Sequence, residues 1–190
     1  MSFRFQPLAA VLAGIRAALV KVLPGKAVLL RRAVANDGQF IFELSLEQTR
    51  RGHFSGDSSD PQVQASLAKL ISCAIDDAPV PMAGPRNGAG ASLWVLTVDL
   101  EPAGFAMFLE DSPGSWSEKV ELIMVALRED YQSRGLGKLL VTRLLSGVQS
   151  KLVYARCRKP STRMKGLLEA RGFKTVEVSE SGTTTLELSG

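Results

Sequence analysis

The sequence predicts a single α/β domain, and three observations support this fold class. First, 190 residues with 45% hydrophobic and 22% charged side chains are typical of one soluble globular domain. Second, strand-like and helix-like segments alternate from residue 26 to the C-terminus, without internal repeats or low-complexity tracts. Third, the almost continuously apolar run 119–127 is typical of a central strand that is buried on both faces.

Residues 1–25 are predicted to form an amphipathic helical extension before the domain at 26–190. The run 7–23 is apolar, but Arg16 interrupts it after a stretch too short to span a bilayer, and no small-residue cleavage motif follows. The helix is expected to end near Pro24 and to pack against the domain or a second subunit, which leaves a homodimer open. The alternative is an anchor at a membrane surface.

The first part of the domain is expected to hold a strand and two helices. Residues 26–33 resemble a strand, and Asn36 or Asp37 offers a cap for the helix that follows. A polar loop at 50–61, rich in turn residues, precedes a second helix. The apolar positions of that helix, from residue 63 to residue 75, are spaced three and four apart.

The middle of the chain predicts a hairpin followed by the central strand. A Pro/Gly-rich connection at 76–90 has no strand-to-helix context and is expected to be a plain loop. Strands at 92–100 and 103–110 follow, with the bend expected at Glu101 and Pro102. A turn at 111–116 then leads into the apolar run already described.

The C-terminal third predicts two helices and three strands. A helix begins at Gly135, with apolar residues on one face as far as residue 148, and 151–157 returns as a strand. The next helix, 161–173, has a serine as its candidate N-cap and Gly172 at its C-terminal end. The chain closes as a hairpin that turns at residues 181–182.

The junction "QSRGLG" at 132–137 is the strongest functional signal, because a buried strand there gives way at once to a helix. The unpaired N–H groups and the positive end of the helix dipole favour phosphate oxygens at such a place. Gly135 and Gly137 lack the β-carbons that would obstruct a bulky anion. Arg134 and Lys138 add positive charge beside them.

Two other phosphate-binding motifs are excluded for this junction. It lacks the four residues that separate the glycines of a Walker A loop, and Leu139 follows the lysine. It also lacks the third glycine of a dinucleotide fingerprint and lies two-thirds along the chain.

The hexapeptide matches the Q/R-x-x-G-x-G/A signature of the GNAT acetyltransferases, which bind the pyrophosphate of acetyl-coenzyme A. The stretch 125–140 resembles the strand-turn-helix core of that family, although Glu129 stands where a proline is common, and 161–173 is similar to its late helix. The order of elements from about residue 27 to 188 also agrees. The resemblance implies the acyl-CoA N-acyltransferase fold, a mixed β-sheet splayed open at its middle strand, for all but the N-terminal helix.

The resemblance also implies the residues that bind acetyl-CoA. The strand would offer backbone groups to the pantetheine arm, the junction amides would bind the pyrophosphate, and Ser161 occupies the position of a helix-opening asparagine that contacts the cofactor. The implied residues are Val125, Ala126, Leu127, Gln132, Ser133, Arg134, Gly135, Leu136, Gly137, Lys138 and Ser161. For Ser161 the alternative is a capping role alone.

Glu121 is the candidate general base. It interrupts an apolar strand, on the face expected to carry Ile123 and Val125, and burial there would raise its pKa toward neutrality. Its spacing from the glycine junction resembles that of the catalytic glutamate in the histone-acetyltransferase branch of the family. The alternatives are a solvated carboxylate paired with Lys119, or Glu118 as a reserve base.

The candidate general acid is less well defined. The family often has a tyrosine where this chain has Leu168. Tyr154 is a substitute on the strand beside the cleft, with a core role as its alternative, and water is another proton source. The expected function is direct transfer of an acetyl group from acetyl-CoA to a primary amine, which is that of a small molecule, a protein lysine or a protein N-terminus. The alternative is a non-catalytic acyl-CoA-binding module or regulatory protein. The loops 50–61 and 111–117 are the expected acceptor-binding segments.

Several classes of partner are disfavoured by the composition. The formal net charge is +4, but the basic residues are scattered and no basic stripe interleaved with aromatic residues indicates nucleic-acid binding. One histidine and two cysteines without metal-ligand spacing predict no metal site, no histidine-based triad and a cytoplasmic, reduced protein.

Overall fold

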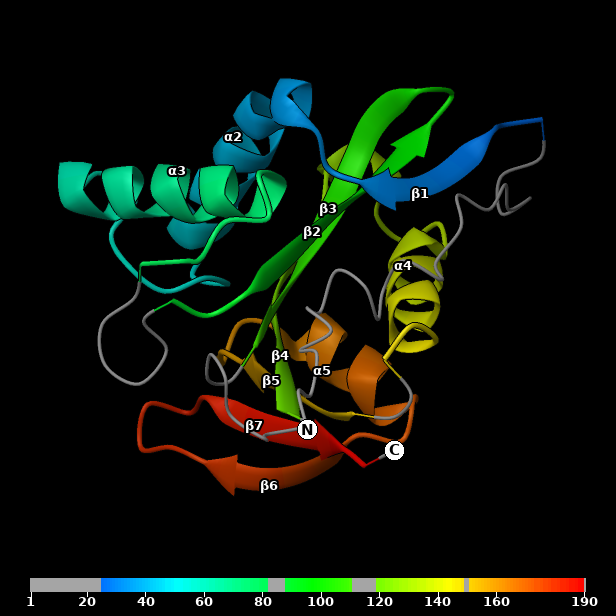
Figure 1. Ribbon diagram of the computed structural model, residues 1–190. Coiled ribbons are helices and arrows are strands. Elements are labelled where there is room, and N and C mark those ends of the chain that lie inside the picture. The colour runs from blue at the N-terminus through cyan, green and yellow to red at the C-terminus, as the bar shows by residue number, and fades with distance from the viewer. Residues whose placement is uncertain (1–24, 82–87, 111–118, 149–150, 190) are drawn as a thin grey trace, which may run out of the picture.

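The computed structural model of the protein describes residues 25–81, 88–110, 119–148 and 151–189. The predicted N-terminal helix, the loop 111–117 and Glu118 lie outside these residues. The described residues form one seven-stranded mixed sheet with the strand order β1-β2-β3-β4-β5-β7-β6, and helices cover both faces (Figure 1). The fold is the acyl-CoA N-acyltransferase fold implied by the sequence.

The elements follow the predicted order closely. The strands are β1 (Val28–Arg32), β2 (Ala91–Val98), β3 (Glu101–Glu110), β4 (Lys119–Leu127), β5 (Leu152–Cys157), β6 (Lys174–Val178) and β7 (Thr184–Leu188). The α-helices are α2 (Gly38–Arg50), α3 (Pro61–Ile75), α4 (Leu136–Leu145) and α5 (Thr162–Glu169). Two short 3₁₀ turns, η1 (Ala35–Asp37) and η3 (Glu129–Tyr131), precede α2 and α4.

Two helix starts show how side chains set local structure. At α3 the Asp60 carboxylate accepts a hydrogen bond from the Gln62 amide at 2.8 Å, and Pro61 occupies the first turn, where no N–H is needed. The predicted cap Asp37 acts differently. Its carboxylate accepts from the Val34 amide at 2.8 Å and pairs with Arg31, so it stabilises η1 and does not cap α2.

The predicted bend of the first hairpin is wrong by two residues. Glu101 and Pro102 pair with β2, and the turn is made by Asp99 and Leu100, with φ angles of 52° and 72°. Asp tolerates this left-handed conformation better than most residues. Its carboxylate also accepts from the Ala27 amide at 2.9 Å, which joins the turn to the start of β1.

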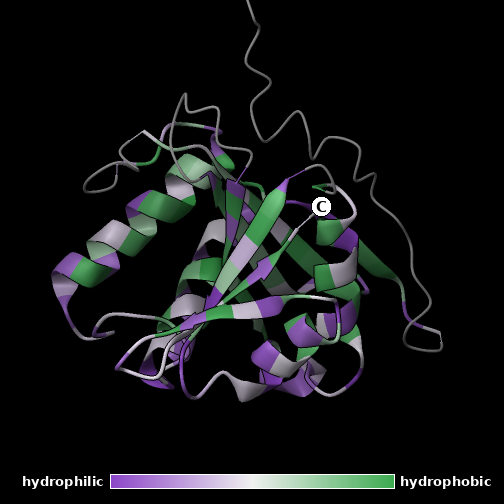
Figure 2. Cartoon of the chain, turned by 90° about the horizontal axis from the view of Figure 1, so that it is seen from below, coloured by the Kyte–Doolittle hydropathy of each residue, from purple (hydrophilic) through white to green (hydrophobic). Residues whose placement is uncertain are grey.

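The sheet separates two hydrophobic cores. One core lies under α4 and α5 and includes Leu136, Leu140 and Leu168, while the other lies under α2 and α3 and includes Ile41 and Phe105. Figure 2 shows apolar residues concentrated in the central strands and mixed polarity along the helices, as amphipathic packing requires.

The middle of the sheet opens, and this opening positions the functional site. β4 pairs with β5 in parallel only from Lys119 to Glu121, opposite Leu152 to Tyr154, and the two strands then separate. On its other edge β4 stays paired with β3 to Leu127. The β5-facing edge of the later part of β4 therefore has no strand partner.

Candidate functional site

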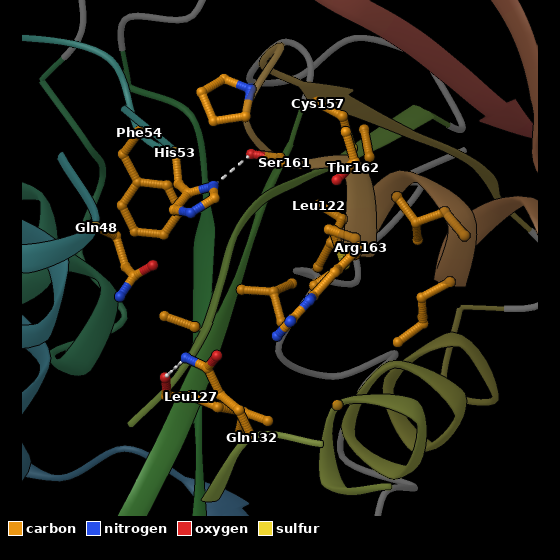
Figure 3. A pocket seen from close by; sticks show the side chains of 18 of the residues that line it. Gln48, His53, Phe54, Leu122, Leu127, Gln132, Cys157, Ser161, Thr162 and Arg163 are labelled. Carbon is orange, nitrogen blue, oxygen red and sulfur yellow. Dashed lines mark hydrogen bonds between the residues drawn. The ribbon is translucent and has the colours of Figure 1, made fainter. Parts of the chain in front are cut away.

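A cavity of roughly 640 Å³ occupies the opening between β4 and β5. Its walls come from residues 122–127 of β4, residues 155–157 of β5, the start of α4, α5, and the end of α2 with the loop that follows it (Figure 3). This volume lies within the range of small-molecule and cofactor sites. Segments far apart in the sequence thus meet at one place, beside the open edge of a strand.

The glycine junction has the backbone geometry of an anion site. Gly135 precedes α4 with φ of 79°, a left-handed conformation that glycine adopts without cost. The first helical hydrogen bond runs from the Leu139 amide to the Gly135 carbonyl at 3.0 Å. The amides of Leu136, Gly137 and Lys138 come before it and have no intrahelical acceptor, so they provide N–H donors at the positive end of the helix dipole.

Most of the cofactor-binding residues implied by the sequence lie together on the cavity wall. Those that line it are Val125, Ala126, Leu127, Gln132, Ser133, Gly135, Gly137, Lys138 and Ser161. Two do not. The Leu136 side chain is fully buried in the α4 core, and the exposed Arg134 lies off the wall.

Gln132 donates hydrogen bonds from both its backbone amide and its side-chain amide. Its amide donates to the Glu129 carbonyl at 3.1 Å, and its side-chain Nε2 donates to the Leu127 carbonyl at 3.0 Å (Figure 3). These two bonds join the end of β4 to the junction. The N–H donors that remain for an anion therefore lie after Gln132.

Glu121 lies inside β4 and not on the cavity wall. Its side chain is 3% exposed, and its two carboxylate oxygens accept hydrogen bonds from Nε and a terminal nitrogen of Arg156 at 2.8 and 2.9 Å. Arg156 lines the cavity and is half exposed. The predicted alternative of a solvated Glu121 is therefore wrong, because the carboxylate is buried and ion-paired.

The expectation that Glu121, Ile123 and Val125 share one face is also wrong in part. The register with β3 shifts between Met107 and Phe108, which pair with Met124 and Leu122, so Ile123 is an extra residue in β4. Ile123 packs on the α2 side, whereas Val125 packs on the α4 side. The bulge breaks the simple alternation of side chains.

No tyrosine of the described residues lines the cavity, so the predicted general acid Tyr154 is not at its wall. Tyr154 sits opposite Glu121 in β5 and does not line the cavity, and Leu168, at the usual tyrosine position, lines it with an apolar side chain. Cys157 also lines the cavity. Burial raises the pKa of its thiol to about 11, so it stays protonated at neutral pH.

His53 is a cavity residue that sequence reasoning missed. The single histidine of the chain argued against a triad, and its position in a polar loop gave no further signal. Its Nδ1 lies 3.0 Å from Ser161 Oγ (Figure 3). Burial, together with the charge of Arg51, lowers the pKa of the His53 ring. The ring is therefore neutral at pH 7. Ser161, predicted as an N-cap, makes no side-chain capping bond to α5.

The loop that carries His53 is joined to the opposite wall of the cavity. Arg158 Nε donates to the Gly52 carbonyl at 2.9 Å, next to the contact between His53 and Ser161. At the other end of the loop, the Gln48 carbonyl accepts from the His53 amide at 2.9 Å. These bonds fix the loop after α2 against the loop before α5.

Two absences apply to the described ranges only. Within residues 25–81, 88–110, 119–148 and 151–189, no three His, Cys, Asp or Glu residues gather in a way that suits a metal ion. In the same ranges no helix has the length and apolarity needed to cross a bilayer.

Comparisons with known proteins agree with this geometry. The model of the Acetyltransferase (GNAT) family matches residues 67–173, more than half of the chain. None of the curated proteins matches the chain.

Solved structures share the fold at low sequence identity. A GCN5-related N-acetyltransferase from Kribbella flavida aligns with a TM-score of 0.66 at 13% identity, over 86% of this chain and 98% of that chain. The Salmonella typhimurium protein yncA, solved with its cofactor acetyl-CoA, gives 0.64 at 17%, over 85% and 93%. The PaiA N-acetyltransferase from Thermoplasma acidophilum, in complex with coenzyme A, gives 0.60 at 14%, over 86% and 99%. With its splayed sheet, glycine junction and family match, the chain belongs to the GNAT family of acetyltransferases, which are acyl-CoA-dependent N-acyltransferases.

Proposed function

We propose that this enzyme transfers the acetyl group of acetyl-CoA directly to a primary amine, with no acyl-enzyme intermediate. The main support is the separation of β4 from β5. It opens a cavity beside an unpaired strand edge, and this cavity extends to the start of α4. Such an opening accepts an extended pantetheine arm along β4 and a diphosphate at α4. The acetyl-CoA and coenzyme A bound in two structural neighbours support this choice of co-substrate.

The donor side of the site consists mainly of backbone. Peptide groups of Val125, Ala126 and Leu127 would bond the pantetheine arm, and the amides after Gln132 would receive the diphosphate, with Lys138 adding charge. Gly137 lines the cavity through its backbone. A peptide N–H of Val125 or Ala126 is the proposed oxyanion donor.

The proposed reaction is a single displacement. The amine nitrogen attacks the acetyl carbonyl carbon, a C–N bond forms, and the C–S bond breaks to release the thiolate of coenzyme A. The amine loses a proton to the base, and the thiolate takes one from solvent, because Tyr154 does not line the cavity and Leu168 has no acid group. Holding both reactants in one cleft supplies a large part of the rate.

Glu121 remains the proposed base, but only through an intervening water. The support is its position in β4, two residues before the bulge and opposite Leu109, which packs in the core under α2 and α3. Its carboxylate does not reach the cavity wall, and Arg156 binds both of its oxygens. A bridging water beside Arg156 would connect the amine to the carboxylate.

Coenzyme A release tests the function. Purified protein with acetyl-CoA is assayed with a thiol reagent against small amines, lysine peptides and peptides with free N-termini, and mass spectrometry checks each acceptor for a gain of one acetyl group. Acceptor-dependent thiol release supports acetyl transfer. Tight acetyl-CoA binding, measured by thermal shift, without thiol release on the whole panel would instead support a non-catalytic binding module.

A further inference from the structure

We infer that Gln48 and His53 together form the subsite that binds the nitrogen of the acceptor amine. This inference rests on the proposed function and deepens it, because it assigns the acceptor side of the cavity. The two side chains lie on the same wall, at the end of α2 and in the loop that follows it (Figure 3).

Gln48 is a buried amide without a partner. The residue is 8% exposed, lines the cavity, and its side chain makes no hydrogen bond to any described residue; its Nε2 is fully buried. Nε2 points away from the cavity, whereas Oε1 points into it and can accept an N–H from a ligand there (Figure 3).

His53 offers a second acceptor atom of the same kind. With Nδ1 protonated and donating to Ser161 Oγ at 3.0 Å, the lone pair of Nε2 is left for a ligand. No described residue bonds Nε2. The lowered pKa keeps the ring neutral, so it accepts from an ammonium group and does not repel it.

Ser161 links this subsite to the donor. Its hydroxyl has one proton, and if that proton is donated to an oxygen of acetyl-CoA, its Oγ must accept from His53 Nδ1. Binding of acetyl-CoA then selects the His53 tautomer that accepts the amine. The expected kinetic order is acetyl-CoA first and amine second.

Phe54 indicates the rest of the acceptor. It lines the cavity beside His53 and is held edge-on against Phe105, with ring centroids 6.5 Å apart. A rigid aromatic wall suits the carbon chain next to the amine. The subsite therefore fits a primary amine on an apolar chain, with two of its N–H bonds directed to Gln48 and His53.

The test compares Gln48→Met and His53→Phe with the full-length parent. Both variants remove hydrogen-bonding atoms and keep side-chain bulk. We expect acceptor KM to rise about tenfold or more in each, as loss of a bond to a charged group predicts, with coenzyme A affinity within about twofold. Thr49→Val is the matched control: it removes a buried hydroxyl bonded to the Ser45 carbonyl one position from Gln48, away from the cavity wall.

One further variant tests the link to the donor, and the outcomes separate the subsite from the proposed function. Ser161→Ala is expected to raise acceptor KM and to weaken the strict order in product-inhibition kinetics. The inference is overturned if the parent turns over amines and Gln48→Met and His53→Phe have the same acceptor KM as the parent, or if coenzyme A affinity falls by as much as acceptor KM rises. No turnover by the parent on any amine refutes the proposed function instead.

Discussion

Replacing the two junction glycines by alanine, one at a time, should shift stability in opposite directions. Gly135 has φ of 79°, so a β-carbon there forces a left-handed L-residue that costs about 1–2 kcal/mol. For a chain of 190 residues this corresponds to a melting temperature lower by about 2–8 °C.

Gly137 lies inside α4, and an added β-carbon would meet Leu127 Cδ1 at 3.6 Å and Leu167 Cδ1 at 3.7 Å, which are ordinary contacts. Alanine there gains helix propensity of up to about 1 kcal/mol, so the melting temperature should rise by about 2–4 °C at most. Differential scanning calorimetry of both variants measures the two shifts.

The two glycine variants should also differ in their affinity for coenzyme A. Gly135→Ala distorts the turn that presents the α4 amides, and we expect Kd to rise about tenfold, equivalent to about 1.4 kcal/mol. Gly137→Ala should change Kd by less than about threefold, because its methyl group faces two leucine side chains. Melting temperatures that move in the same direction, or an unchanged Kd in Gly135→Ala, would refute the assignment of the junction.

The remaining predictions concern the chemistry of the cavity. Glu121→Gln should leave coenzyme A affinity unchanged and lower kcat by about 100-fold or more, because a general base contributes about that much to the rate. An unchanged kcat would show that another group is the base. Glu177→Gln, on the exposed β6, is the control. Burial and the charge of Arg51 lower the pKa of His53, and Arg158 lies on the facing loop. The ratio of kcat/KM of the parent to that of His53→Asn should therefore be constant at neutral pH and fall at acidic pH, where the ring becomes charged. A ratio that stays constant or rises down to the pH at which the protein unfolds contradicts this. Cys157, with a pKa of about 11, should resist iodoacetamide at pH 7.5 in the folded protein and react on unfolding, as mass spectrometry will show.

The sequence by itself predicted the elements and the residues that we propose bind acetyl-CoA. Continuous apolar residues predicted β4 with its observed bounds, and three-and-four spacing predicted α3 and α4. The junction was equally readable, because Gly135 and Gly137 act through local backbone geometry that neighbouring residues fix. Local rules failed in detail, at the predicted caps Asp37 and Ser161 and at the turn of Asp99.

The tertiary structure decided the acceptor side. Gln48 looks like any polar residue of a helix, and only packing against the loop buries its amide beside the cavity. His53 and Ser161 are 108 residues apart, and no spacing rule joins them. The Arg156 partner of Glu121 and the bulge at Ile123 likewise depend on which strands lie side by side. The residues in contact across the sheet opening are far apart in the sequence. Only the packing of the folded chain brings them together, so local sequence patterns do not predict these contacts.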